Sequence, residues 1–152
     1  MRLPILLAGL IVSASALPAA ATGTLECEIK DKSVSFSLHA GMTRGMGSPT
    51  FSLKGEMEVR DKGVAPDLRT IGFANEDRPQ YWMNSKELRM VLYTERNTDR
   101  PFASVELELL TKAAGDDGSY GGSYKLTIHD MSTGGGEGKT TTLRGKVGCS
   151  VD

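Results

Sequence analysis

The sequence has 152 residues, a formal net charge of −1 and 39% hydrophobic residues, which is the composition of an ordinary soluble protein. A charge so close to zero gives no reason to expect nucleic acid or an anionic membrane as a partner. Apart from an apolar leader, about one third of the residues are hydrophobic, which is enough for one core and hardly for two.

The first 21 residues have the features of a signal peptide. Arg2 supplies a short positive region, residues 5–12 are apolar, and residues 19–21 (Ala-Ala-Ala) have the small-x-small form of a signal peptidase site. An uncleaved membrane anchor is the alternative, but two serines and a proline interrupt the apolar stretch and no basic cluster follows it. We therefore expect cleavage after residue 21, export to a periplasm or the extracellular space, and a single domain over residues 22–152 that is not inserted in a membrane.

Two cysteines lie near the two ends of the expected mature chain. Export permits a disulfide, and Cys27 and Cys149 allow only one intramolecular pair. Such a bridge closes a loop of about 120 residues, for which the loss of chain entropy in the unfolded state predicts a stabilisation of about 4–5 kcal/mol. No CxxC spacing favours redox chemistry. The sequence therefore predicts a structural disulfide.

The hydrophobic residues recur mostly with a period of two, which is typical of half-buried β-strands. In chain order, the alternating runs cover residues 25–30, 33–38, 51–60, 71–73, 87–95, 104–109, 124–128 and 143–149. Polar or glycine-rich segments separate them, at residues 31–32, 41–49, 61–63, 96–101, 115–118 and 134–138.

Two stretches are less regular. Residues 64–86 show no sustained period. Residues 87–95 fit a strand, but they also fit a helix with Ser85 as its N-cap. We predict a strand there, because a matching alternating run follows after a turn.

About eight short strands predict an all-β domain built as an antiparallel meander, either a small barrel or a two-sheet sandwich. Cys27 falls on the first predicted strand and Cys149 on the last. Both stand at apolar positions of the alternating pattern, so their side chains are expected to face inward. If these strands are neighbours, the sheet closes on itself and the disulfide lies at the seam. A sandwich with the disulfide between its sheets fits nearly as well. Gly55 and Gly145 occupy inward positions in their strands, where a tight corner is the expected reason.

One motif resembles the end of a phosphate-binding loop. Residues 134–140 read Gly-Gly-Gly-Glu-Gly-Lys-Thr, but Thr133 stands where that pattern requires its first glycine. The motif must also open a helix, whereas a threonine-rich strand sequence follows here. We therefore expect a hairpin loop and no nucleotide site.

No constellation of residues predicts catalysis or metal binding. His39 and His129 are the only histidines, and each is expected on the surface or at a rim. Residues 116–118 (Asp-Asp-Gly) lack the spaced carboxylates of a calcium loop and read as a solvated turn. No GxSxG nucleophile motif occurs. We therefore expect no cofactor and no enzymatic activity.

The candidate recognition residues are Phe73, Tyr81, Trp82 and Met83, which lie in the least regular segment and include the only tryptophan. Aromatic residues on loops often anchor binding sites, although the same residues would also plug the end of a barrel. We expect a monomeric, non-enzymatic binding or interaction module for an unknown protein. The alternative is a lipocalin-like carrier of a small apolar ligand, which differs from such a module by having a large internal cavity. A secreted enzyme without a recognisable motif is the third interpretation, and it would require polar side chains clustered in a cleft with perturbed pKa values.

Overall fold

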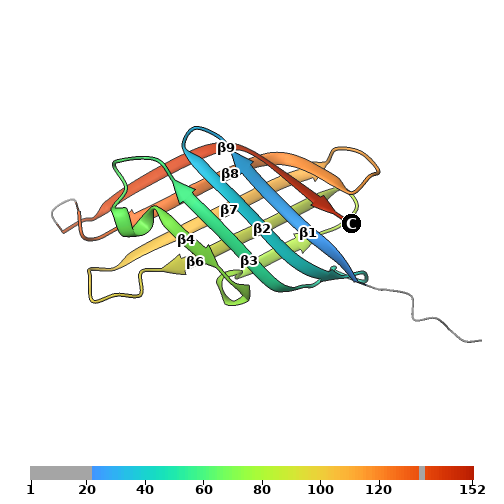
Figure 1. Ribbon diagram of the computed structural model, residues 1–152, viewed down its shortest axis with the longest axis horizontal. Helices are drawn as coiled ribbons and strands as arrows, with labels where there is room; N and C mark the ends of the chain where they lie inside the picture. Colours follow the sequence, from blue (N-terminus) through green and yellow to red (C-terminus); the bar gives the residue numbers. More distant parts are fainter. Residues whose placement is uncertain (1–21, 134–135) are drawn as a thin grey trace, which may run out of the picture.

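The computed structural model describes residues 22–133 and 136–152 (Figure 1). The predicted signal peptide, residues 1–21, and residues 134–135 of the predicted 134–138 loop lie outside these residues. The strands are β1 (Thr22–Lys30), β2 (Val34–Thr43), β3 (Thr50–Val59), β4 (Thr70–Phe73), β5 (Gln80–Met83), β6 (Glu87–Glu95), β7 (Ala103–Ala113), β8 (Ser119–Asp130) and β9 (Lys139–Val151). Two short 3-10 turns, η1 (Pro66–Leu68) and η2 (Asn75–Asp77), flank β4.

The nine strands form one antiparallel sheet that curls into a half-barrel, in the order β4-β3-β2-β1-β9-β8-β7-β6-β5 (Figure 1). This confirms the predicted all-β meander in its barrel-like form; the sheet is single rather than a two-sheet sandwich. Residues 87–95 form strand β6, as predicted. The first and last strands are neighbours, and Cys27 pairs directly with Cys149 in a disulfide.

The terminal strands β1 and β9 meet at the disulfide, as predicted, but the sheet does not close on itself, because it is open elsewhere. Its two edges are β4 and β5, which follow each other in the chain. Because every strand pair is antiparallel, β4 and β5 run in the same direction, as two halves of an interrupted strand would. β4 is hydrogen-bonded to β3, β5 is hydrogen-bonded to β6, and η2 contacts both β3 and β6. The backbone N–H of Leu53 on β3 donates to the side-chain oxygen of Asn75 at 2.9 Å, which replaces a ladder bond at the interruption.

The inner face of the curled sheet holds the hydrophobic core. Alternate side chains of every long strand point inward, and those with the largest volume and almost no exposure include Phe36, Leu92, Leu107, Tyr124 and Leu126. The outward side chains of the same strands are mostly charged or hydroxylated. The period of two in the sequence therefore corresponds to one buried and one solvated face.

The two inward glycines make room for aromatic rings rather than for tight corners. A Cβ on Gly145 would lie 2.6 Å from a ring carbon of Tyr124, and a Cβ on Gly55 would lie 3.3 Å from the Cβ of Phe73. Beside Gly145, the Tyr124 hydroxyl donates a hydrogen bond to the Asp31 carboxylate at 2.6 Å. We conclude that each glycine allows a close approach between a backbone and a ring.

A buried ion cluster closes one end of the half-barrel. Arg96, which follows β6, donates to Asp67 of η1 at 2.7 Å and to Asp130 of β8 at 2.9 Å. The side chain of Arg96 is 2% exposed and that of Asp130 is 7% exposed. The Arg96 guanidinium and the Ser132 hydroxyl and N–H lower the pKa of Asp130 to about 2, against the opposing effect of burial. The cluster thereby ties η1, next to the open edge, to the centre of the sheet.

Candidate functional site

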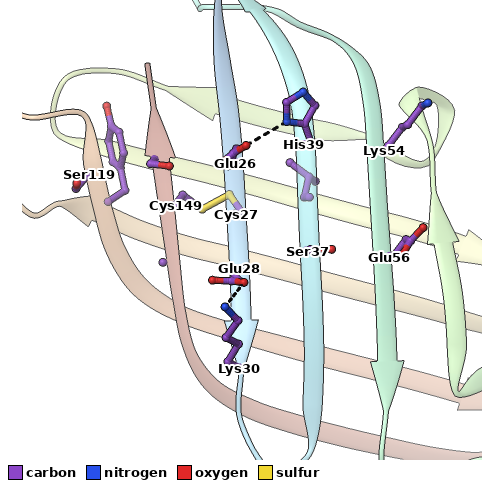
Figure 2. Close-up of a pocket in the computed structure, with 14 residues that line it drawn as sticks. Glu26, Cys27, Glu28, Lys30, Ser37, His39, Lys54, Glu56, Ser119 and Cys149 are labelled. Atoms are coloured by element: carbon purple, nitrogen blue, oxygen red, sulfur yellow. Dashed lines mark hydrogen bonds and ion pairs between the residues drawn. A yellow bond between two sulfur atoms is a disulfide. The ribbon is translucent and has the colours of Figure 1, made fainter.

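A groove of about 780 Å³ lies on the outer face of the sheet (Figure 2). We call it the outer groove. Its lining side chains come mainly from β1, β2, β3 and β9: Glu26, Glu28, Lys30, Ser37, His39, Lys54, Glu56 and Ser150. Gly148 of β9 leaves the centre of the floor bare, since a Cβ there would meet nothing within 4 Å.

The chemistry of the outer groove is polar and mixed in charge. His39 lies 3.3 Å from Glu26, and Lys30 forms an ion pair with Glu28 (Figure 2). All four side chains are more than half exposed, so these pairs contribute little to stability. Within the described residues, no serine or threonine hydroxyl is hydrogen-bonded to His39. The arrangement therefore offers hydrogen bonds to a polar ligand but no nucleophile paired with a base.

A second depression, of about 560 Å³, lies on the outer face of β5, β6 and β7. Trp82 of β5 is 57% exposed, and Leu110 of β7 is 51% exposed. Both pair with Arg89 of β6, one from each side, so the three residues form a row across the strands. Val91 and Glu108 form the next row. We call these five residues the Trp82 surface; it combines two exposed apolar side chains with one charge of each sign.

The structure separates the four candidate recognition residues. Phe73 is buried on β4, and the centroid of its ring lies 6.3 Å from the centroid of the Phe36 ring. Tyr81 and Met83 are half-buried and pack against the core, whereas Trp82 between them faces outward. The alternation of β5 is the reason, because neighbouring residues of a strand point to opposite faces.

Tyr81 is held firmly on the inner side. Its hydroxyl donates to the sulfur of Met83 at 3.1 Å, and the guanidinium of Arg78 lies 5.1 Å from the centre of its ring. Burial raises the pKa of Tyr81 to about 12. Tyr81 and Met83 therefore support the open edge from within, while Trp82 presents its ring to solvent.

The sequence analysis identified only Trp82 of this surface, and Leu110 is its second exposed apolar side chain. Residues 106–110 read Glu-Leu-Glu-Leu-Leu, so the last leucine breaks the alternation of β7. One of two adjacent leucines in a strand must face outward. That doubling is the sequence signal that points to this exposed residue.

The remaining predicted residues are distributed over the fold. Cys27 and Cys149 are buried and form the disulfide, which is compatible with an oxidising compartment. His39 lies on the outer groove, and His129 lies at the end of β8. Residues 116–118 lie in the β7–β8 hairpin turn, where Gly118 has a φ of +80°.

Two further observations concern the described part of the chain as a whole. It contains no group of three or more His, Cys, Asp or Glu side chains placed to hold a metal ion. None of its helical segments has the length and apolar character needed to cross a membrane.

No known protein family, curated protein or solved structure matches the chain.

Proposed function

We propose that this protein is an exported, non-enzymatic binding module that recognises an extended polypeptide through the Trp82 surface and the free edge of β5. The observation that carries the proposal is the exposure of the only tryptophan, on a four-residue edge strand, beside a second exposed apolar side chain at Leu110. Large apolar side chains that are exposed together are characteristic of interaction sites. Trp82 offers a large rigid contact area at a low cost in conformational entropy.

The free edge of β5 supports an extended ligand in particular. β5 is hydrogen-bonded to β6 on one side only, so its other side presents backbone groups with no strand partner among the described residues. An extended peptide that pairs with such an edge gains main-chain hydrogen bonds. Its alternate side chains would then lie on the outer face beside Trp82.

The lipocalin-like carrier has less support. A carrier needs an internal apolar cavity of several hundred Å³. The inner face of this sheet is occupied by buried side chains, and the outer groove and the Trp82 surface both lie on its outer face. Export is the part of the proposal that rests on the predicted signal peptide, with which the Cys27–Cys149 disulfide is compatible.

A selection from a phage-displayed library of random peptides tests the function. Peptides enriched on the disulfide-bonded protein are measured by calorimetry against Trp82→Ala and Leu110→Lys. We expect each variant to weaken binding by about 30-fold or more, the loss typical of truncating an interface hot spot. Met46→Ala is the matched control, because Met46 is fully exposed but stands in the β2–β3 loop, and it should bind as the unchanged protein does.

Two results would contradict the proposal. One is a selection that enriches no peptide above the background on bare resin. The other is a set of peptides that bind Trp82→Ala and Leu110→Lys as tightly as the unchanged protein. A lipid that copurifies at one equivalent in native mass spectrometry, with Trp82→Ala retaining it, would instead support the carrier.

A further inference from the structure

His129 and Met131 bring a nitrogen and a sulfur donor together at the end of β8. The Nε2 atom of His129 lies 3.1 Å from the sulfur of Met131. Both residues are partly buried, whereas Asp130 between them is buried. A metal ion bound at ordinary Zn–N or Zn–S type distances of about 2.0–2.3 Å to each donor would require the two atoms to be about 3–4 Å apart. The pair therefore needs little rearrangement to chelate one ion.

The imidazole is oriented by the neighbouring strand. Its other nitrogen, Nδ1, lies 3.1 Å from the hydroxyl of Thr140, the residue of β9 that pairs with His129. A hydrogen bond to the second nitrogen fixes the ring of a ligating histidine and is the usual outer contact of such a ligand. Gly138 closes the other side, because a Cβ on it would lie 2.8 Å from the Met131 sulfur and 2.9 Å from the imidazole Cε1. Its φ of +74° also favours glycine.

The thioether sulfur of Met131 is a soft donor, the imidazole nitrogen of His129 is a common ligand of copper, and the carboxylate between them in the sequence is engaged elsewhere. Asp130, between the two residues, points inward and accepts hydrogen bonds from Arg96 and Ser132. Thioether sulfur selects Cu(I)-like ions, while hard ions such as Mg²⁺ and Ca²⁺ require oxygen donors. We propose that His129 and Met131 form a binding site for a soft monovalent cation, Cu(I) or Ag(I), with a coordination position open to a further ligand from solution.

The proton balance of this site is simple. A neutral His129 imidazole that carries its proton on Nε2 can donate to the sulfur of Met131 and accept at Nδ1 from the Thr140 hydroxyl. When the cation occupies Nε2, the proton resides on Nδ1 instead, and the Thr140 hydroxyl becomes the acceptor. A hydroxyl performs either role, so the imidazole stays neutral and no proton is released.

The test is a titration of the disulfide-bonded protein with Ag(I), followed by competition for Cu(I) against bicinchoninate with ascorbate as the reductant. We expect one equivalent of each ion to bind. His129→Gln and Met131→Leu should each lower the affinity by at least about tenfold, the lower end of what the loss of a site contact costs in metal affinity. His39→Gln and Met46→Leu are the matched controls, since they remove the same donor types from exposed positions elsewhere, and both should change the affinity less than twofold. Mass spectrometry confirms that the disulfide remains oxidised.

A Thr140→Val variant separates ligation from general stability. It keeps the shape of the residue but removes the partner of Nδ1, and it should weaken Ag(I) binding by several-fold with unchanged stoichiometry. The proposal is overturned if the unchanged protein binds neither ion, if His129→Gln and Met131→Leu retain full affinity, or if Zn(II) displaces Cu(I) from the site. His129 pairs with Ser104 of β7, six residues along that strand from Leu110, so the site does not share residues with the Trp82 surface and none of these results bears on peptide binding.

Discussion

Two junctions of the sheet are held in different ways. At the first, the terminal strands β1 and β9 pair in register, and the disulfide joins Cys27 to Cys149 across a Cα separation of 4.0 Å. At the second, the consecutive strands β4 and β5 do not pair with each other, and η2 lies at the interruption (Figure 1). The sheet is therefore open between β4 and β5, although these strands follow each other in the chain. It is continuous between β1 and β9, although these are the first and last strands.

The difference between the junctions shows how stability and recognition are distributed. The β1–β9 junction combines ladder hydrogen bonds, buried side chains and a covalent bond. The β4–β5 junction depends on side chains, namely the Asn75 bond to β3 and the ion cluster of Arg96. Binding surfaces are drawn from the less stable parts of a protein. The exposed Trp82 lies at the second junction, as this principle leads one to expect.

Removal of the disulfide should produce the largest effect on stability. The bridge spans 122 residues, and replacing both cysteines with alanine should lower the free energy of unfolding by about 4 kcal/mol, mainly because the unfolded chain regains its freedom. Urea unfolding followed by circular dichroism measures the change. A loss of less than about 1 kcal/mol would mean that the hydrogen-bonded pairing of β1 with β9 is sufficient without the covalent bond.

Asp130→Asn should have the next largest effect. It leaves the buried Arg96 with only Asp67 as a charged partner, and breaking a buried ion pair typically costs about 3 kcal/mol. Asp117→Asn is the control, because Asp117 lies in an exposed hairpin turn and should change stability by less than about 0.5 kcal/mol. Equal effects of the two substitutions would show that the cluster does not hold the open side of the sheet.

Acid should weaken the same cluster in a defined window. The folded protein holds the pKa of Asp130 at about 2, below its ordinary value of 3.8, so the carboxylate stabilises the fold above about pH 4. That contribution, of the order of 2 kcal/mol, disappears as the pH falls from about 4 to 2. Urea midpoints measured across this range should fall steeply for the unchanged protein and less steeply for Asp130→Asn. Parallel curves would assign the acid sensitivity to other carboxylates.

The inward glycine of β9 provides a smaller effect with a close control. Gly145→Ala places a Cβ 2.5 Å from the Asp31 carboxylate and 2.6 Å from the Tyr124 ring, so we expect a loss of about 1.5 kcal/mol from overpacking. Gly148→Ala, three residues further along the same strand, adds its Cβ to open space in the outer groove and should cost almost nothing. Thermal unfolding of the two variants compares them directly. Equal costs would contradict the assignment of these positions to opposite faces.

The regular part of the fold was predictable because each long strand carries its own alternation of apolar and polar residues. The disulfide was predictable because two cysteines allow a single pair. Strand β5 was missed, since four residues, Gln-Tyr-Trp-Met, are too short to show a period. The open edge was also missed. The alternation of apolar and polar residues shows which face of the sheet a side chain occupies, but it does not show which strands lack a partner.

The candidate sites were also only partly predictable, because the neighbours of a single residue depend on strand pairing that the local sequence does not reveal. Trp82 was identified by its type, but its separation from Tyr81 and Phe73 depends on the strand that the sequence did not reveal. His129 and Met131 are two residues apart, which is the spacing of side chains on one face of a strand. The contact of His129 with Thr140 depends on the register between β8 and β9, a long-range property that no local pattern contains.

Trp82→Ala should have the smallest effect on stability. The side chain faces outward on a strand that holds its place through Tyr81 and Met83, so we expect a change in the free energy of unfolding of less than about 0.5 kcal/mol. Tyr81→Ala, its neighbour on the same strand, removes a half-buried ring and its hydrogen bond to Met83, and it should cost about 2–3 kcal/mol. Urea unfolding of the two variants compares the outer and inner sides of β5. A large loss in Trp82→Ala would mean that the ring supports the open edge, and its exposure would then no longer favour a role in recognition.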